Sequence, residues 1–107
     1  MTTFDRRKDA YEAKFARDEE LRFKALARRN RLLGLWAAEK IGLSGEEAAA
    51  YAQAVVGSDL SAPGEEDVFQ KVKTDLEAKG MIVSSDEIWK TMQILLSKAV
   101  GEIDGLR

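Results

Sequence analysis

Cysteine and histidine are both absent from this chain of 107 residues. Without cysteine the chain can form no disulfide and has no thiolate nucleophile, and without histidine it lacks the commonest general acid or base. Together the two absences remove the usual protein ligands of transition metals. The sequence also has no glycine-rich phosphate loop, no dinucleotide-binding pattern and no calcium-binding loop. It therefore predicts a protein that is not an enzyme, with no catalytic residues, no metal site and no required cofactor.

Long apolar runs are missing as well. No stretch approaches the roughly 18 residues of a membrane-spanning helix, and the N-terminus has no apolar core of a secretory signal. The chain has a single proline, and its length suits one domain. We therefore expect one cytoplasmic domain that does not insert into a membrane.

Charge is unevenly distributed along the chain, although the net charge is only −2. Residues 21–40 contain six lysines and arginines against Glu39 alone, whereas residues 41–107 contain six against twelve acidic residues. Residues 21–40 are thus near +5 and residues 41–107 near −6. This asymmetry predicts either a bipolar surface or an internal match of opposite charges.

The first two helical segments are marked by apolar spacing and by helix-end signals. The first is expected over about residues 18–41 and ends before Gly42, a favourable residue after a helix. Its main apolar stripe consists of Leu26, Leu33, Ala37 and Ile41. A capping box from Ser44 to Glu47 then starts a second helix, which is expected to stop at Gly57 and to be followed by a loop over residues 57–64.

Two more helices are expected in the remaining sequence. The third begins at the acidic run Glu65-Glu66-Asp67, which suits the positive end of a helix dipole better than it suits a cation site, and Gly80 closes it. A short apolar link over residues 81–83 is expected to fold onto the core, and a second capping box at Ser84 starts the last helix. Four apolar helix faces with short connections predict an all-α, up-and-down four-helix bundle over residues 20–107.

The first 20 residues have a different character, because eleven of them are charged and the large side chains besides Met1 are aromatic. Phe4, Tyr11 and Phe15 would lie on one narrow stripe of a helix. Such a stripe cannot offset an ordering cost of about 1–2 kcal/mol per residue, so we expect a mobile helical segment that orders in the groove of a partner. The alternative is a frayed helical tail without a function.

A basic run at Arg28-Arg29-Asn30-Arg31 raises the alternative of a small module that binds nucleic acid or a nucleotide, with Arg22 as a further contact. A helix would place Arg28 and Arg31 on one side and would place Arg29 and Asn30 near the apolar stripe. We therefore favour an internal hydrogen bond for Asn30. Core packing is the favoured interpretation for Trp36 and Trp89, ahead of ligand stacking.

Several short blocks, in order along the chain, resemble the zeta-subunit family, the inhibitor of alphaproteobacterial F-type ATP synthase. The blocks begin with residues 1–5, Glu12-Ala-Lys-Phe15 and residues 18–23. They are centred on residues 27–38 and continue at Val55-Val56, Ser58-Asp59, Pro63-Gly64 and residues 66–69. A string of blocks that covers nearly the whole chain is more specific than any one of them.

The resemblance implies a four-helix bundle whose N-terminal segment enters a catalytic interface between alpha and beta subunits of the ATPase head and blocks rotation in the hydrolytic direction. Carried onto this chain, the inhibitory segment is residues 1–19, and its expected partner-binding residues are Phe4, Tyr11, Lys14, Phe15 and Arg17. The expected partner is the catalytic head with its alpha, beta and gamma subunits, at the cytoplasmic face of the inner membrane. We expect no nucleic-acid partner and a monomeric free chain.

The resemblance also implies binding of ADP or ATP on the bundle. No phosphate-binding motif places such a site in this sequence. The residues chosen as candidates are Arg28, Arg29, Asn30 and Trp36.

Overall fold

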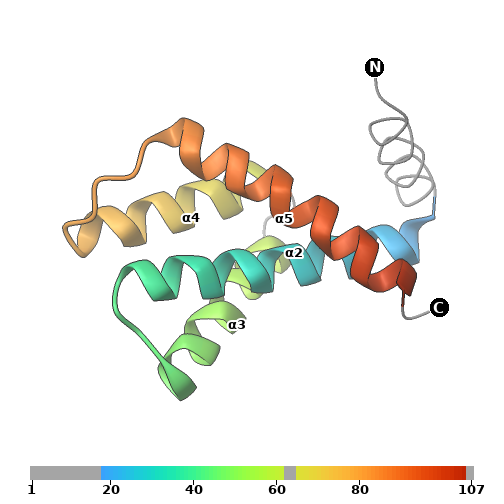
Figure 1. Ribbon diagram of the computed structural model, residues 1–107, viewed down its shortest axis with the longest axis horizontal. Helices are drawn as coiled ribbons and strands as arrows, with labels where there is room; N and C mark the ends of the chain where they lie inside the picture. Colours follow the sequence, from blue (N-terminus) through green and yellow to red (C-terminus); the bar gives the residue numbers. More distant parts are fainter. Residues whose placement is uncertain (1–17, 62–64, 106–107) are drawn as a thin grey trace.

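The computed structural model describes residues 18–61 and 65–105, which form four helices and, within those ranges, no strand. The helices are α2 (Glu19–Lys40), α3 (Gly45–Ser61), α4 (Glu65–Ala78) and α5 (Ser85–Gly105) (Figure 1). The prediction of an all-α, four-helix fold is confirmed. The segment predicted to be mobile, up to residue 17, lies outside the described residues.

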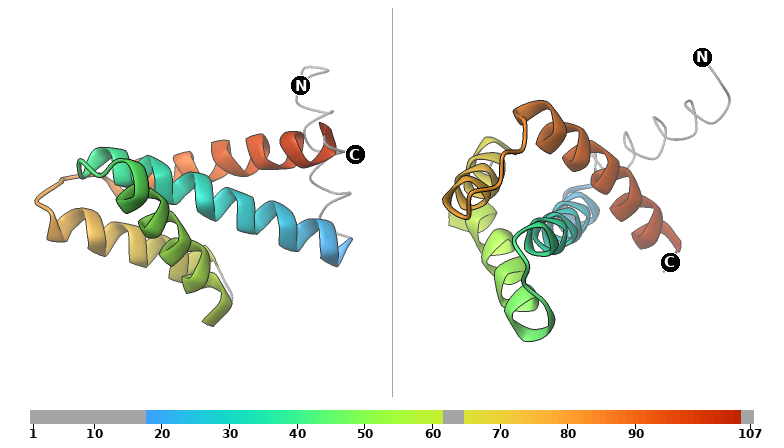
Figure 2. Two further views of the ribbon diagram at one scale, coloured as in Figure 1. Left: turned by 90° about the horizontal axis from the view of Figure 1, so that it is seen from below. Right: turned by 60° about the vertical axis from the view of Figure 1, so that its left-hand side comes forward.

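Helix α2 is the centre of the fold, because it packs against each of the other three helices. Among the described residues, the backbones of α3 and α5 do not come close to each other, and the two helices lie on different sides of α2 (Figure 2). Successive helices alternate in direction, and α3 crosses α2 obliquely (Figure 1). Residues of α2 are therefore the ones placed to link the other helices.

The ends of α2 follow from its capping residues. The Asp18 carboxylate accepts a hydrogen bond from the Leu21 backbone N–H at 3.1 Å and caps the first turn, which also carries two acidic residues. At the other end Gly42 has a φ of +83°, and the Leu43 N–H donates to the Ala38 carbonyl at 2.9 Å. This is the glycine-terminated end expected from the sequence.

Helix α3 is longer than the sequence suggested. It continues through Gly57 to Ser61, so the predicted stop at Gly57 and the predicted loop over residues 57–61 are wrong. A glycine inside a helix costs only about 1 kcal/mol, which packing of the helix can override. Here Val55 is fully buried in the core two residues before Gly57, and Ser58 Oγ donates to the Val55 carbonyl at 2.6 Å.

Helices α4 and α5 meet at a turn that begins with Gly80, whose φ is +77°. The predicted cap at Ser84 is confirmed, since Ser84 Oγ accepts from the Glu87 N–H at 3.1 Å. The preceding link only partly folds onto the core: Met81 and Val83 pack against it, whereas Ile82 is fully exposed. In an extended link neighbouring side chains point to opposite sides, so one of three faces solvent.

The capping box predicted at Ser44 has a different form. Helix α3 begins at Gly45, which has a φ of +56°, and Ser44 contributes its backbone carbonyl, which accepts from the Ala48 N–H at 3.4 Å.

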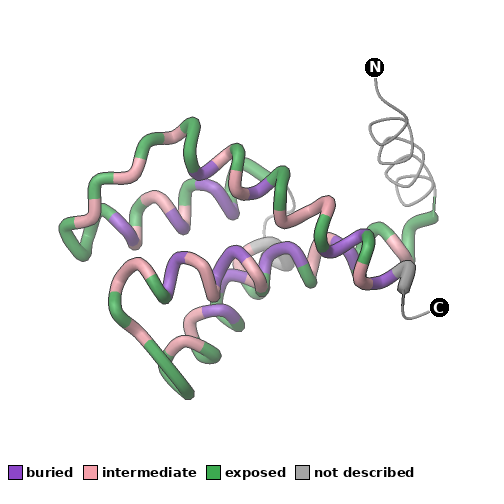
Figure 3. The backbone as a smooth tube through the Cα atoms, viewed as in Figure 1, coloured by how far each residue is buried: buried purple, intermediate pink, exposed green. Residues whose placement is uncertain are grey.

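The apolar core consists of a large and a small cluster of buried side chains. The large cluster lies where all four helices meet and comprises Leu33, Ala37, Val55, Val68, Phe69, Val72, Leu76, Ile88 and Met92. The small cluster joins the first half of α2 to the second half of α5 and comprises Ala25, Val100 and Ile103. Buried segments accordingly lie along the inner sides of the helices in Figure 3.

Candidate functional site

The predicted partner-binding residues Phe4, Tyr11, Lys14, Phe15 and Arg17 lie outside the described residues. The structure does describe the junction that follows them. Asp18 has extended backbone angles, φ −102° and ψ 106°, and caps α2, whose first residue is Glu19. Glu19, the last residue of the predicted inhibitory segment, therefore belongs to the bundle, and Asp18 separates α2 from the chain that precedes it.

The basic run on α2 is divided between the surface and the interior. Arg28 and Arg31 are exposed, whereas Arg29 and Asn30 are buried. This division is the one that helical geometry predicted from the sequence. It means that the run does not form one continuous basic surface.

Arg29 is the most buried charged side chain among the described residues, with 1% of its surface exposed. Its Nε donates to Asn30 Oδ1 at 2.7 Å, and its Nη1 lies 3.3 Å from Glu65 Oε1. The internal hydrogen bond predicted for Asn30 is thereby confirmed. A buried guanidinium is tolerable only when it is paired and hydrogen-bonded, and Glu65, which is partly exposed, supplies the opposite charge.

The Arg29–Glu65 pair joins the middle of α2 to the first residue of α4. The sequence indicated that Glu65 belongs to a first helical turn but gave no sign of its partner. A pair of residues this distant in sequence can be recognised only from the packing of the two helices.

Arg28 makes a separate contact with α5. Its Nε lies 3.2 Å from Glu102 Oε1, and its Nη2 donates to Glu102 Oε2 at 3.4 Å. This hydrogen bond is the main cause that lowers the pKa of the Glu102 carboxyl. Desolvation opposes the shift, and the charges of Arg28 and Lys98 lower the pKa further. Each arginine proposed for a nucleotide site therefore faces a carboxylate of its own.

Trp36 packs on the outside of the large core cluster, as its core interpretation predicted. The ammonium of Lys40 lies 4.9 Å from the centre of the Trp36 ring. Trp36 follows Arg29 by two helical turns, which is about 10 Å along the axis of α2. The structure thus brings Arg29 and Asn30 together, but it sets Trp36 and Arg28 apart from them.

Trp89 likewise packs against the core, where its ring stacks on that of Phe69 with centres 4.5 Å apart.

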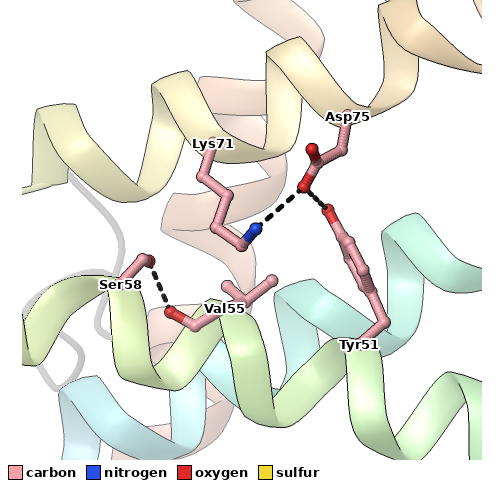
Figure 4. Close-up of polar contacts among 5 residues, drawn as sticks. All are labelled: Tyr51, Val55, Ser58, Lys71 and Asp75. Atoms are coloured by element: carbon pink, nitrogen blue, oxygen red, sulfur yellow. Dashed lines mark hydrogen bonds and ion pairs between the residues drawn. The ribbon is translucent and has the colours of Figure 1, made fainter.

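A polar contact between α3 and α4 was not predicted from the sequence. The Tyr51 hydroxyl donates to Asp75 Oδ2 at 2.8 Å, and Lys71 Nζ donates to the same oxygen at 3.1 Å (Figure 4). Burial raises the pKa of Tyr51 well above its usual range, and the hydrogen bond and charge of Asp75 raise it further. The i, i+4 spacing of Lys71 and Asp75 was the one available signal. The contact fixes two helices to each other and supplies no reactive group.

The first half of α2 carries an exposed surface of mixed character. Phe23 has 60% of its surface exposed, and Lys24, Arg28 and Arg31 form an exposed stripe that is turned by roughly 80–140° around the helix from Phe23. Lys24 pairs with Glu20 at 3.2 Å and Arg28 pairs with Glu102, whereas Arg31 has no ion-pair partner among the described residues.

Residues 18–61 and 65–105 hold no group of three or more possible metal ligands, and no helix in those ranges is long and apolar enough to cross a membrane.

Comparisons with known proteins agree with the fold and the resemblance. A family model described as ATPase inhibitor subunit zeta matches residues 1–102. A solved structure, described as the solution NMR structure of a protein, has 41% sequence identity and a TM-score of 0.71, and the match covers 81% of this chain and 99% of that chain. The comparison with curated proteins finds no match.

Proposed function

Since the family model spans residues 1–102, this chain belongs to the ATPase inhibitor subunit zeta family, and we propose that it inhibits ATP hydrolysis by inserting its N-terminal segment at a catalytic interface between alpha and beta subunits of the ATPase head. Membership makes the chain a regulatory inhibitor rather than an enzyme, with ATP synthase as the implied partner. The insertion, the subunits contacted and the position at the cytoplasmic face of the inner membrane belong to the proposal.

The observation that carries the proposal is that the family match includes both the first residues and the bundle. Two features of the structure support separate roles for the N-terminal segment and the bundle. The four helices bury a core of their own, and Asp18 caps α2 so that the bundle begins with its own helix start. In the proposal, residues 1–17 are the part that acts on the partner.

In this proposal Phe4, Tyr11 and Phe15 are the anchors, and Lys14 and Arg17 are polar contacts of the same segment. Aromatic side chains are the commonest anchors of protein interfaces, because each buries a large area at a low cost in conformational entropy. A segment that blocks rotation has to stay bound when ATP binds to the head, and these anchors would hold it in place.

The test is a titration of ATP hydrolysis by a purified ATPase head with the full chain. Changing Phe4, Tyr11 and Phe15 together to alanine should weaken inhibition at least tenfold, because truncation of one central anchor commonly costs about 2 kcal/mol. Ile94→Ala, which truncates a 66% exposed apolar residue on α5, is the matched control and should inhibit like the natural chain. Equal inhibition by the triple variant would contradict the proposal.

The alternative of a nucleic-acid module is less well supported by the geometry. Arg29 is buried against Glu65, and Arg28 is paired with Glu102, so the basic run offers a narrower surface than the sequence suggested. A salt titration against duplex DNA separates the two functions, because binding to phosphates falls steeply with salt.

Binding of ADP or ATP remains a prediction from the resemblance, with Arg28, Arg29, Asn30 and Trp36 as its candidate residues. A nucleotide phosphate at Arg28 would have to compete with Glu102. Calorimetry with ADP on the natural chain and on Arg28→Gln tests this, and equal affinity would remove Arg28 from the site.

A further inference from the structure

One end of the bundle is built from two helix ends. The start of α2 and the end of α5 run side by side and extend beyond α3 and α4 (Figure 2). The buried side chains there are Ala25 of α2 with Val100 and Ile103 of α5, and Leu21 and Leu96 pack against them. Among the described residues, no side chain of α3 or α4 belongs to this small cluster. The two helix ends therefore depend on each other for burial.

The inner limit of this end of the bundle is set by contacts with the large cluster and with α4. On α2 the limit is Arg29, whose side chain pairs with Glu65 of α4. On α5, Leu95 packs against the large cluster, whereas Leu96 packs against the small one. We call the two helix ends beyond these limits, residues 19–28 and 96–105, the terminal clasp.

The terminal clasp buries much less apolar surface than the rest of the bundle. Its small cluster includes an alanine, and Ile103 keeps 9% of its surface exposed. In the large cluster, every side chain except Phe69 is at most 1% exposed. The one aromatic side chain of the clasp, Phe23, is 60% exposed and adds little burial. Since hydrophobic stabilisation grows with the apolar area removed from water, the clasp is held less firmly than the core.

Polar contacts add little to the attachment of the two ends. The Arg28–Glu102 pair joins them, but it lies at the surface, where ion pairs contribute little. The Glu20–Lys24 pair and the Asp18 cap stabilise α2 itself and do not reach α5. Helices as short as either half are marginal in water without packing, and Gly101 further weakens the α5 half. Neither half is therefore expected to stay ordered once it leaves the other.

We propose that the terminal clasp opens as one unit, with both helix ends melting together, while the bundle around the large cluster stays folded. Loss of order at one end removes the burial of the other, so the two ends open together. In the closed state residues 1–17 join ordered helix at Asp18, and in the open state that junction moves to about Arg29. The end of α5 thereby sets where the N-terminal segment leaves the folded chain. Opening is a property of the free chain and does not rest on the function proposed above.

The experiment is native-state hydrogen exchange of the full free chain, followed for each amide by NMR at low urea concentrations. Relative to unfolded-chain rates, amides of residues 25–28 and 100–103 should exchange at least about tenfold faster than those of Leu33, Val72 and Met92. Urea should accelerate exchange in the clasp only weakly, because opening exposes little surface. Equal protection and equal urea dependence of the two sets would overturn the proposal.

Gly101→Ala tests whether the two ends open together. Gly101 lies in the α5 half of the clasp with open space around it, so alanine stabilises the helix there without a new contact. If α5 melts whenever the clasp opens, exchange of residues 25–28 on α2 should slow about two- to fivefold. If the start of α2 frays by itself, the substitution stabilises the closed and frayed states equally. Unchanged exchange of residues 25–28 would therefore overturn the proposal.

Gly57→Ala is the matched control, because Gly57 is also a helical glycine with open space around it but lies in α3, outside the clasp. Since α3 stays folded when the clasp opens, this variant should slow exchange of Leu33 and Val72 about two- to fivefold and leave residues 25–28 unchanged. Equal slowing of both sets by Gly57→Ala would show that the clasp opens only by unfolding of the whole bundle, and would overturn the proposal. The ATPase head is absent from these measurements, so failure of the proposed function would not alter their result.

Discussion

The two halves of α2 differ both in sequence character and in surroundings, since six of residues 19–29 but only three of residues 30–40 are charged. In the second half, Leu33, Ala37 and Ala38 are completely buried, and α3 approaches so closely that Gly34 has no room for a side chain. In the first half, buried contacts come from the small cluster with α5, and Phe23 is exposed. One helix therefore serves as the centre of the core at one end and as a surface at the other.

This difference divides a single element into a strongly packed and a weakly packed half. Side chains in the second half are enclosed on several sides, so a change there leaves a cavity or a clash. Side chains in the first half have solvent on one side, so most changes there leave the fold intact. The first half also follows directly after the predicted inhibitory segment. Stability measurements along α2 should reveal the boundary between the two halves.

The largest expected effect is that of Leu33→Ala. Leu33 is fully buried where the four helices meet, and the free energy of unfolding should fall by about 2–5 kcal/mol, the usual range for such a truncation. The matched control is Leu26→Ala, the same substitution two turns earlier on the same side of α2, where the leucine is only partly buried. The free energy of unfolding of Leu26→Ala should fall by about 1 kcal/mol. Urea unfolding measures both, and equal losses would erase the contrast between the halves.

A smaller but more specific effect is expected for Gly34→Ala. An added Cβ would lie 2.6 Å from Ala52 Cα, so the backbones of α2 and α3 would have to move apart. We expect the free energy of unfolding to fall by about 1–3 kcal/mol because of overpacking, although alanine is more favourable than glycine in a helix by about 1 kcal/mol.

Gly57→Ala is the control for helix propensity, because that position in α3 has open space around it. The control should be stabilised by about 0.5–1 kcal/mol. Thermal unfolding measures both variants. A lower midpoint for Gly34→Ala together with a higher midpoint for Gly57→Ala would confirm the close approach of α2 and α3, whereas a higher midpoint for Gly34→Ala would contradict it.

The smallest expected effect concerns the pH dependence of the Arg28–Glu102 pair on the first half of α2. The hydrogen bond from Arg28 lowers the pKa of Glu102 below its ordinary value of 4.5 in the folded chain. The contribution of the ionised Glu102 to stability is therefore present above pH 4.5, and it is lost as the pH falls through the lower pKa that Glu102 has in the folded chain.

The natural chain should exceed Glu102→Gln in stability at neutral pH by a small margin, because the pair is exposed to solvent. Urea midpoints measured from neutral to acid pH should converge at the acid end. A margin that does not shrink with falling pH would show that Glu102 acts through something other than its charge.

Most of the fold could be predicted from local chemistry. The start of α2 at Asp18, its end at Gly42 and the start of α5 after Ser84 all follow from side chains and backbone angles within a few residues. The continuation of α3 through Gly57 could not be predicted, because the local preference of glycine is outweighed by packing of Val55 in a core assembled from distant segments.

The interior of the candidate site was predictable only in part. Helical periodicity placed Arg29 and Asn30 on the inner side of α2, and the structure confirms this. The partners Glu65, Glu102 and Asp75 come from other helices, so their identity depends on the register between helices, which no single segment encodes. The same holds for Phe23: its segment predicts a helix, but its exposure depends on where α3 stops covering α2.

The central claim, that residues 1–17 carry the inhibition and α2–α5 carry the fold, is tested most directly by a chain that begins at Asp18. This boundary keeps the cap of α2, whose removal would cost about 1 kcal/mol and confuse the comparison. The measurement is ATP hydrolysis by a purified ATPase head titrated with the full and shortened chains, with helicity and urea midpoint recorded for both. We expect the shortened chain to keep an unchanged bundle and to lose inhibition completely. Inhibition by the shortened chain at the concentration at which the full chain inhibits would contradict it.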